Sequence, residues 1–89
     1  MKLSRQLTVR NKLGIHARPA IKLVELNARY DAELTIIDGE KRASADSVMG
    51  LLVLASAQGS TLTVVAEGKD AEQAMDAVQQ LIEDKFEED

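Results

Sequence analysis

The order of hydrophobic and polar residues in the first half of the chain predicts a strand, a helix and then two further strands. Residues 3–10 alternate between apolar and polar side chains, which is the pattern of a half-buried strand. From 17 to 29 the apolar residues recur at helical spacing, with charged residues on the opposite arc. Residues 32–38 and 41–45 flank a Gly-Glu turn, so they are expected to form a β-hairpin.

The second half predicts a short helix, a strand and a long helix. Asp46 and Ser47 supply cap chemistry for a short helix in residues 47–56, although Gly50 weakens this helix and the apolar run also allows a buried strand. Residues 61–67 alternate as a strand does. Asp70 and Gln73 then resemble a capping pair for a final helix. Its core-facing stripe at helical spacing contains Ala71, Ala74, Met75, Val78, Leu81 and Ile82.

These elements give the order βαββαβα within one expected domain, residues 1–89. The chain shows no internal repeat or linker, and its length allows a single core of two layers. We therefore expect an α+β fold, with one antiparallel sheet and helices packed on a single face.

The composition of the chain limits the kind of core, the reactive groups and the location that can be expected. The two aromatic residues, Tyr30 and Phe86, are too few to fill a core, so an aliphatic core is expected. The absence of cysteine excludes disulfides, a zinc–thiolate site and a thiol nucleophile. The N-terminus lacks an apolar signal region, and no apolar run approaches the roughly 18 residues of a membrane span, so a cytoplasmic protein without a membrane segment is expected.

Charge is distributed unevenly along the chain. Residues 1–29 carry seven basic side chains against Glu25, whereas residues 67–89 carry nine acidic side chains against Lys69 and Lys85. This polarity suits charged protein partners. Nucleic acid is disfavoured as a partner, because the net charge is -4 and basic residues do not alternate with aromatic ones.

Residues 14–19, Gly-Ile-His-Ala-Arg-Pro, place the single histidine, His16, where a strand leads into a helix. The first backbone N–H groups of that helix, from Ala17 and Arg18, would point at an anion carried by the imidazole. A phosphoryl group fits best, since a neutral imidazole nitrogen is a competent nucleophile. Arg18 offers a fork of donors to phosphate oxygens, and Pro19 fixes the first helical turn without removing a needed donor.

Other chemistries are less well supported. One histidine without cysteine or a nearby pair of carboxylates offers too few metal ligands. No second histidine is present to activate a serine, and the nearest acidic residue in the sequence, Glu25, lies more than two helical turns from His16. A group carrier, which needs neither a metal nor a cofactor, remains.

The stretch GIHARPA (14–20) resembles the active-site signature of the HPr family of phosphocarriers, from the bacterial phosphoenolpyruvate-dependent phosphotransferase system. With DAELTI, ASADSVMGLLVLASAQGSTLTVVAEG and the last helix, the resemblance covers residues 3–86. It implies an open-faced β-sandwich with four antiparallel strands and three helices on one side. It also implies that His16 accepts a phosphoryl group at Nδ1 from an enzyme I-type donor and passes it to an enzyme IIA-type acceptor. Arg18 and Pro19 match the family's partners of that histidine.

Within the family, NKLGIHARPAIKL, YDAEL and the ending FEED are most similar to the nitrogen-related branch, the NPr type. A sugar-branch carrier stays an alternative, as does a protein that binds regulatory targets stoichiometrically and is switched by phosphorylation of His16. A metabolite-sensing α+β domain is a rival from another class, but it leaves GIHARP unexplained.

Ser47 has two interpretations. By resemblance it aligns with the family's regulatory serine, which a kinase phosphorylates in some bacteria. As an N-cap it would stabilise the short helix by about 1 kcal/mol with no kinase involved.

The resemblance also implies a docking surface around His16 for successive partners. Among its candidates, Ile21 is the most telling, because it lies on the polar arc of its helix, where a structural stripe would not require it. A monomer is expected, because a carrier must present the same face to each partner. The exposed apolar candidates for this surface are Ile15, Ile21, Val48, Met49 and Leu52, although by composition alone each could equally belong to the core.

Overall fold

The computed structural model describes residues 1–88, and its elements follow the predicted order. The strands are β1 (Lys2–Thr8), β2 (Glu33–Asp38), β3 (Lys41–Ser44) and β4 (Thr61–Glu67). The helices are α1 (Ala17–Arg29), α2 (Val48–Leu54) and α3 (Ala71–Glu83), followed by the short turn η1 (Lys85–Glu87). The βαββαβα order is confirmed, and the apolar run after Ser47 forms a helix rather than a strand.

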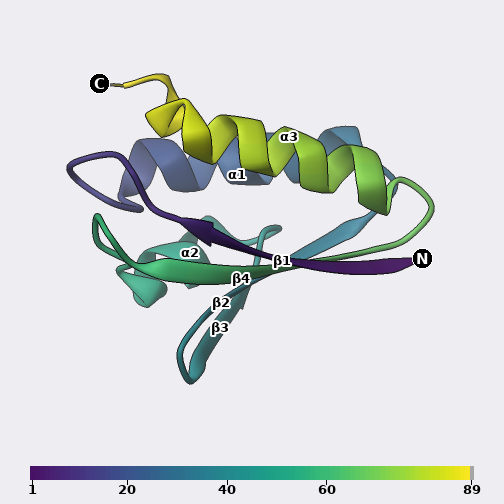
Figure 1. Cartoon of the computed structure of the whole chain (residues 1–89), viewed down its shortest axis with the longest axis horizontal. Coiled ribbons are helices and arrows are strands. Elements are labelled where there is room, and N and C mark those ends of the chain that lie inside the picture. The colour runs from purple at the N-terminus through teal and green to yellow at the C-terminus, as the bar shows by residue number, and fades with distance from the viewer. Residues whose placement is uncertain (89) are drawn as a thin grey trace.

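The four strands form one antiparallel sheet in the order β1-β4-β2-β3. The helices α1 and α3 lie side by side across one face of this sheet (Figure 1). The third helix, α2, packs against β3 and α1. This arrangement is the predicted open-faced fold, and it brings both the start of α1 and the end of α3 to the same end of the molecule (Figure 1).

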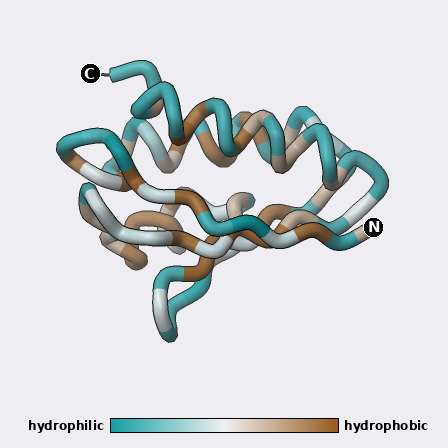
Figure 2. Tube along the Cα trace, in the orientation of Figure 1, coloured by the Kyte–Doolittle hydropathy of each residue, from teal (hydrophilic) through white to brown (hydrophobic). Residues whose placement is uncertain are grey.

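The core lies between the sheet and the helices, and its buried apolar residues come from α1, α3 and the strands. Figure 2 shows hydrophobic residues recurring along these helices and strands. Met75 is fully buried, as predicted. The expectation of an aliphatic core was wrong in one respect, because the aromatic ring of Phe86 is also fully buried. Phe86 thereby fixes the segment after α3 to the core.

The two predicted helix caps differ in outcome. Ser47 is the N-cap of α2, and its Oγ accepts a hydrogen bond from the backbone N–H of Gly50 at 3.0 Å. The predicted capping pair of Asp70 and Gln73 was wrong, because the Asp70 side chain makes no cap hydrogen bond. Asp70 lacks the extended backbone of an N-cap, and its Oδ2 instead accepts from the backbone N–H of Asp31 at 2.8 Å.

Replacing Ser47 with alanine should lower the free energy of unfolding by about 1 kcal/mol, because the substitution removes the cap of α2. Urea denaturation followed by circular dichroism measures this change. Ser47→Asp is the matched control, since a carboxylate can accept the same bond and should retain most of the stability. Equal losses in both variants would show that the hydroxyl does not act as a cap.

Candidate functional site

The loop that carries the histidine is tied to the segment after α2. Gly14 has φ 68°, a left-handed conformation, and its Cα approaches the backbone of Ser56 and Ala57 closely. The backbone N–H of Ile15 donates to the carbonyl of Ser56 at 2.8 Å, and the Ile15 side chain is only 4% exposed. The loop therefore presents His16 from a fixed backbone.

His16 is the N-cap of α1 and lies half-buried at its start. Its carbonyl accepts from the N–H of Ala20 at 3.1 Å, and Pro19 has no N–H to donate. The N–H groups of Ala17 and Arg18 are left without an acceptor inside the helix, and the positive end of the helix dipole lies beside them. The site thus has the backbone donors that the sequence predicted.

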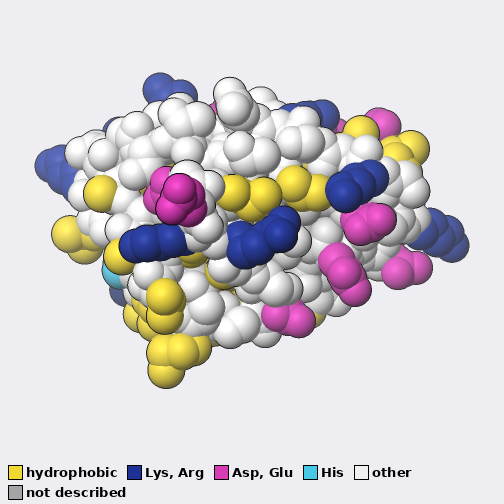
Figure 3. All heavy atoms as spheres, turned by 90° about the horizontal axis from the view of Figure 1, so that it is seen from below, with side chains coloured by type: hydrophobic (Ala, Val, Ile, Leu, Met, Phe, Trp, Pro, Cys, Tyr) yellow, Lys and Arg dark blue, Asp and Glu magenta, His cyan; other side chains and the backbone are white. Residues whose placement is uncertain are grey.

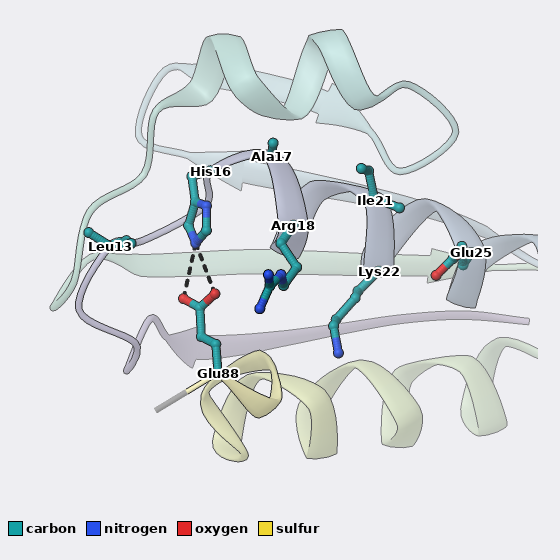
Figure 4. Close-up of a pocket in the computed structure, with 8 residues that line it drawn as sticks. All are labelled: Leu13, His16, Ala17, Arg18, Ile21, Lys22, Glu25 and Glu88. Atoms are coloured by element: carbon teal, nitrogen blue, oxygen red, sulfur yellow. Dashed lines mark hydrogen bonds and ion pairs between the residues drawn. The ribbon is translucent and has the colours of Figure 1, made fainter.

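The imidazole of His16 contacts a carboxylate from the far end of the chain. Its Nε2 lies 2.9 Å from Oε2 and 3.1 Å from Oε1 of Glu88 (Figure 4). The other ring nitrogen lies on the side of α1 and Arg18 (Figure 4). The side chain of Glu88 is 9% exposed, against 36% for that of His16. The same carboxylate accepts a hydrogen bond from Nδ2 of the buried Asn11 at 2.7 Å.

The sequence interpretation missed Glu88. It took Glu25 as the nearest acidic residue, whereas 72 positions separate His16 from the carboxylate that touches it. The one signal in the sequence is Phe86, an apolar residue within an acidic ending, whose burial anchors the tail beside the site. Sequence distance was a poor guide to the surroundings of the imidazole.

Cations flank the histidine on α1. The exposed side chain of Arg18 makes no hydrogen bond or ion pair with any residue in the range 1–88, so its donors are available to a ligand. Lys22, one turn later, pairs through Nζ with Oε1 of Glu87 at 2.8 Å. His16, Ala17 and Arg18 line one open pocket, and their roles in binding a phosphoryl group stay predictions.

The apolar side chains of Leu13 and Ile21 also line this pocket. Of the predicted docking residues, Ile21 and Met49 are exposed by 46% and 72%, whereas Val48 and Leu52 are half-buried against the core. The prediction that Ile15 is exposed was wrong, because the Gly14 turn directs it into the core.

The sequence also missed two exposed residues, Leu13 at 73% and Val53 at 68%. Leu13, Ile21, Met49 and Val53 are called the apolar patch below. Hydrophobic side chains gather at the end of the molecule where the histidine reaches the surface (Figure 3).

Two further features of residues 1–88 bear on the chemistry. The described side chains contain no group of three or more His, Asp or Glu residues placed to hold a metal ion. Over the same range, no helix combines the length and the apolar character needed to cross a bilayer.

Comparison with known proteins places this site in a family. A family model described as the PTS HPr component phosphorylation site matches residues 3–84. The phosphocarrier protein NPr of Shewanella violacea is 53% identical over 87 residues, covering 98% of this chain and 96% of its own. NPr of Escherichia coli K12 is 43% identical over the full length of both chains, and an HPr of Xylella fastidiosa is 39% identical over 98% of both.

The structure agrees with this similarity. It superposes on a crystal structure of HPr from Thermoanaerobacter tengcongensis with a TM-score of 0.92, at 34% identity, covering 98% of each chain. An HPr from Bacillus anthracis gives a TM-score of 0.86 at 34% identity, covering 91% of this chain and 96% of that one. The chain belongs to the HPr family of phosphocarrier proteins of the phosphotransferase system.

Proposed function

We propose that this HPr-family carrier works in the nitrogen-related branch of the phosphotransferase system. It accepts a phosphoryl group on Nδ1 of His16 from an enzyme I-type donor and passes it to a histidine of an enzyme IIA-type acceptor. The observation that carries this proposal is the position of His16 at the start of α1, beside two free N–H groups and Arg18. The similarity to two NPr proteins supports the branch.

The geometry explains how the imidazole could hold the group. The lone pair of Nδ1 attacks phosphorus, and a new N–P bond forms as the N–P bond of the donor breaks and its electron pair returns to the donor nitrogen. The phosphoryl group adds close to two negative charges. The N–H groups of Ala17 and Arg18, the α1 dipole and the Arg18 guanidinium stabilise these charges. Pro19 begins the helix without competing for them.

The apolar patch supplies the contact with partners. Exposed apolar side chains near a reactive group mark an interaction surface, and Leu13 and Ile21 of the patch line the pocket that holds His16. Donor and acceptor would use this surface in turn, which suits a monomeric, cytoplasmic carrier made of one domain, residues 1–89. Regulatory target proteins would bind the same face, and phosphorylation of His16 would alter its charge. Phosphorylation of Ser47 stays a prediction from the resemblance.

Intact-mass spectrometry tests the proposed function. The protein is incubated with phosphoenolpyruvate, magnesium and either a nitrogen-type or a sugar-type enzyme I. We expect a gain of one phosphoryl group that is lost on mild acid treatment, with faster transfer from the nitrogen-type donor. Faster transfer from the sugar-type donor would reassign the branch. Transfer from neither donor would contradict the carrier function and favour stoichiometric binding.

Replacing Met49 with glutamate should slow transfer from the enzyme I donor roughly tenfold, because docking would desolvate a charge at an exposed position of the apolar patch. Gln6→Glu adds the same charge on the open face of the sheet, away from His16, and should transfer at the wild-type rate. Stopped transfer reactions separated by native gel electrophoresis give both rates. Equal rates for the two variants would exclude Met49 from the docking surface.

A further inference from the structure

The chain leaves α3 through a turn of unusual backbone geometry. Lys85, Phe86 and Glu87 have φ values of 55°, 54° and 64°, and none of them is glycine. The left-handed conformation costs such residues on the order of 1 kcal/mol each. The turn returns the tail toward the start of α1 and places Glu88 against His16 (Figures 1 and 4).

Burial of polar groups around Glu88 is also unfavourable in free energy. Its carboxylate is 9% exposed, and burial of a carboxylate is unfavourable without donors. One donor is Nδ2 of Asn11, a fully buried amide whose Oδ1 has no hydrogen-bond partner among residues 1–88. The same Nδ2 donates to the carbonyl of Gly14 at 2.7 Å, so Asn11 links the tail to the histidine loop.

The strained turn and the buried Asn11 both hold the Glu88 carboxylate against Nε2 of His16. The fully buried ring of Phe86 anchors the turn, and the Lys22–Glu87 pair fixes its outer side. Strained backbone and unpaired buried groups persist where the surrounding structure enforces them, and they concentrate at functional sites. Here they maintain the contact between the Glu88 carboxylate and Nε2 of His16.

We propose that Glu88 is a positioning residue for the phosphoryl transfer, and this inference rests on the proposed function. Its carboxylate accepts a hydrogen bond from Nε2–H of His16, which keeps the proton on Nε2 and the lone pair on Nδ1. Nδ1 then lies on the side of Ala17 and Arg18, where the phosphoryl group is received (Figure 4).

The same contact assists the transfer. When Nδ1 forms its bond to phosphorus, positive charge develops on the ring, while the proton stays on Nε2. The carboxylate of Glu88 stabilises that charge, much as the aspartate of a catalytic triad stabilises an imidazolium. Because Glu88 contacts the ring nitrogen opposite the phosphoryl position, it does not have to leave when the group arrives.

Three variants test the proposal in the full-length protein. Glu88→Ala removes the acceptor, and Glu88→Gln keeps an acceptor but removes the charge. Glu83→Gln is the matched control, because it removes one charge near the end of α3. Glu83 accepts a hydrogen bond from Gln79 at 3.2 Å and lies outside the pocket that holds His16. Thermal denaturation checks that all three variants are folded.

The first measurement is the Nε2–H signal of His16 in protein labelled with ¹⁵N-histidine, which is unambiguous because the chain has one histidine. A hydrogen-bonded Nε2–H that exchanges slowly with water is expected in the wild type, Glu83→Gln and Glu88→Gln, and it should be lost in Glu88→Ala. An identical signal in Glu88→Ala would overturn the proposal. This readout needs no donor, so it decides the contact even if the proposed function fails.

The second measurement is the rate of phosphoryl acceptance from enzyme I. Loss of a charge-assisted hydrogen bond should slow Glu88→Ala roughly tenfold, with a smaller loss in Glu88→Gln and none in Glu83→Gln. A rate in Glu88→Ala equal to or above that of Glu83→Gln would overturn the positioning role, and an increase would show that the tail obstructs the site. Absence of transfer in the wild type would instead contradict the proposed function.

Discussion

Replacing His16 with alanine is expected to abolish phosphorylation of the chain while leaving the fold intact. The chain contains one histidine and no cysteine, so it offers no other imidazole and no thiol to accept the group. The fold should survive because the His16 side chain is 36% exposed and makes no cap hydrogen bond to α1. We expect a stability loss of about 1 kcal/mol, because the Glu88 carboxylate loses the His16 donor and keeps that of Asn11.

Intact-mass spectrometry after incubation with phosphoenolpyruvate and enzyme I measures this loss. Ser47→Ala is the matched control, because it removes a hydroxyl from α2 and leaves the imidazole unchanged, so it should still gain one phosphoryl group. An acid-labile group on His16→Ala would show that another residue is the acceptor. Loss of the wild-type circular dichroism spectrum in His16→Ala would instead show that the histidine is structural.

Periodicity predicted the order of the elements, but it left the run after Ser47 open between a helix and a buried strand. The helix predicted at 17–29 coincides with α1, and the strand predicted at 61–67 coincides with β4. Both segments bury one face, so the spacing of their apolar residues matches the period of a helix in one and of a strand in the other. The donors at His16 were predictable for the same reason, since the start of a helix always leaves N–H groups free.

The surroundings of the imidazole were not predictable, because they depend on contacts that no local pattern encodes. Glu88 reaches His16 through three consecutive left-handed residues that are not glycine, a conformation that sequence propensities disfavour. Ile15 looks like an exposed neighbour of the histidine, but the turn at Gly14 directs it inward. Asp70 has the residue type of a cap, yet it bonds to Asp31. Each error involved a tertiary contact that overrode a local preference.

The turn at Gly14 leads to the second large expected effect, which is on stability. A Cβ at this position would overlap the carbonyl oxygen of Ser56 and lie 2.9 Å from the Cα of Ala57. Both obstacles are backbone, so they cannot rotate away as a side chain could, and the φ of 68° is itself unfavourable for alanine. Gly14→Ala must therefore separate the two segments and weaken the hydrogen bond from Ile15 to Ser56. We expect it to lower the free energy of unfolding by roughly 3 kcal/mol or more.

Gly39→Ala separates the two causes of this loss. Gly39 has a similar φ of 62°, but a Cβ there would meet no atom within 4 Å. It should therefore show the cost of the left-handed backbone alone, about 1 kcal/mol. Urea denaturation of both variants measures the difference, which is the cost of forcing the histidine loop away from Ser56. Equal losses of unfolding free energy in the two variants would mean that the histidine loop can move away from Ser56 without cost. The contact between Gly14 and Ser56 would then not be what fixes the position of His16.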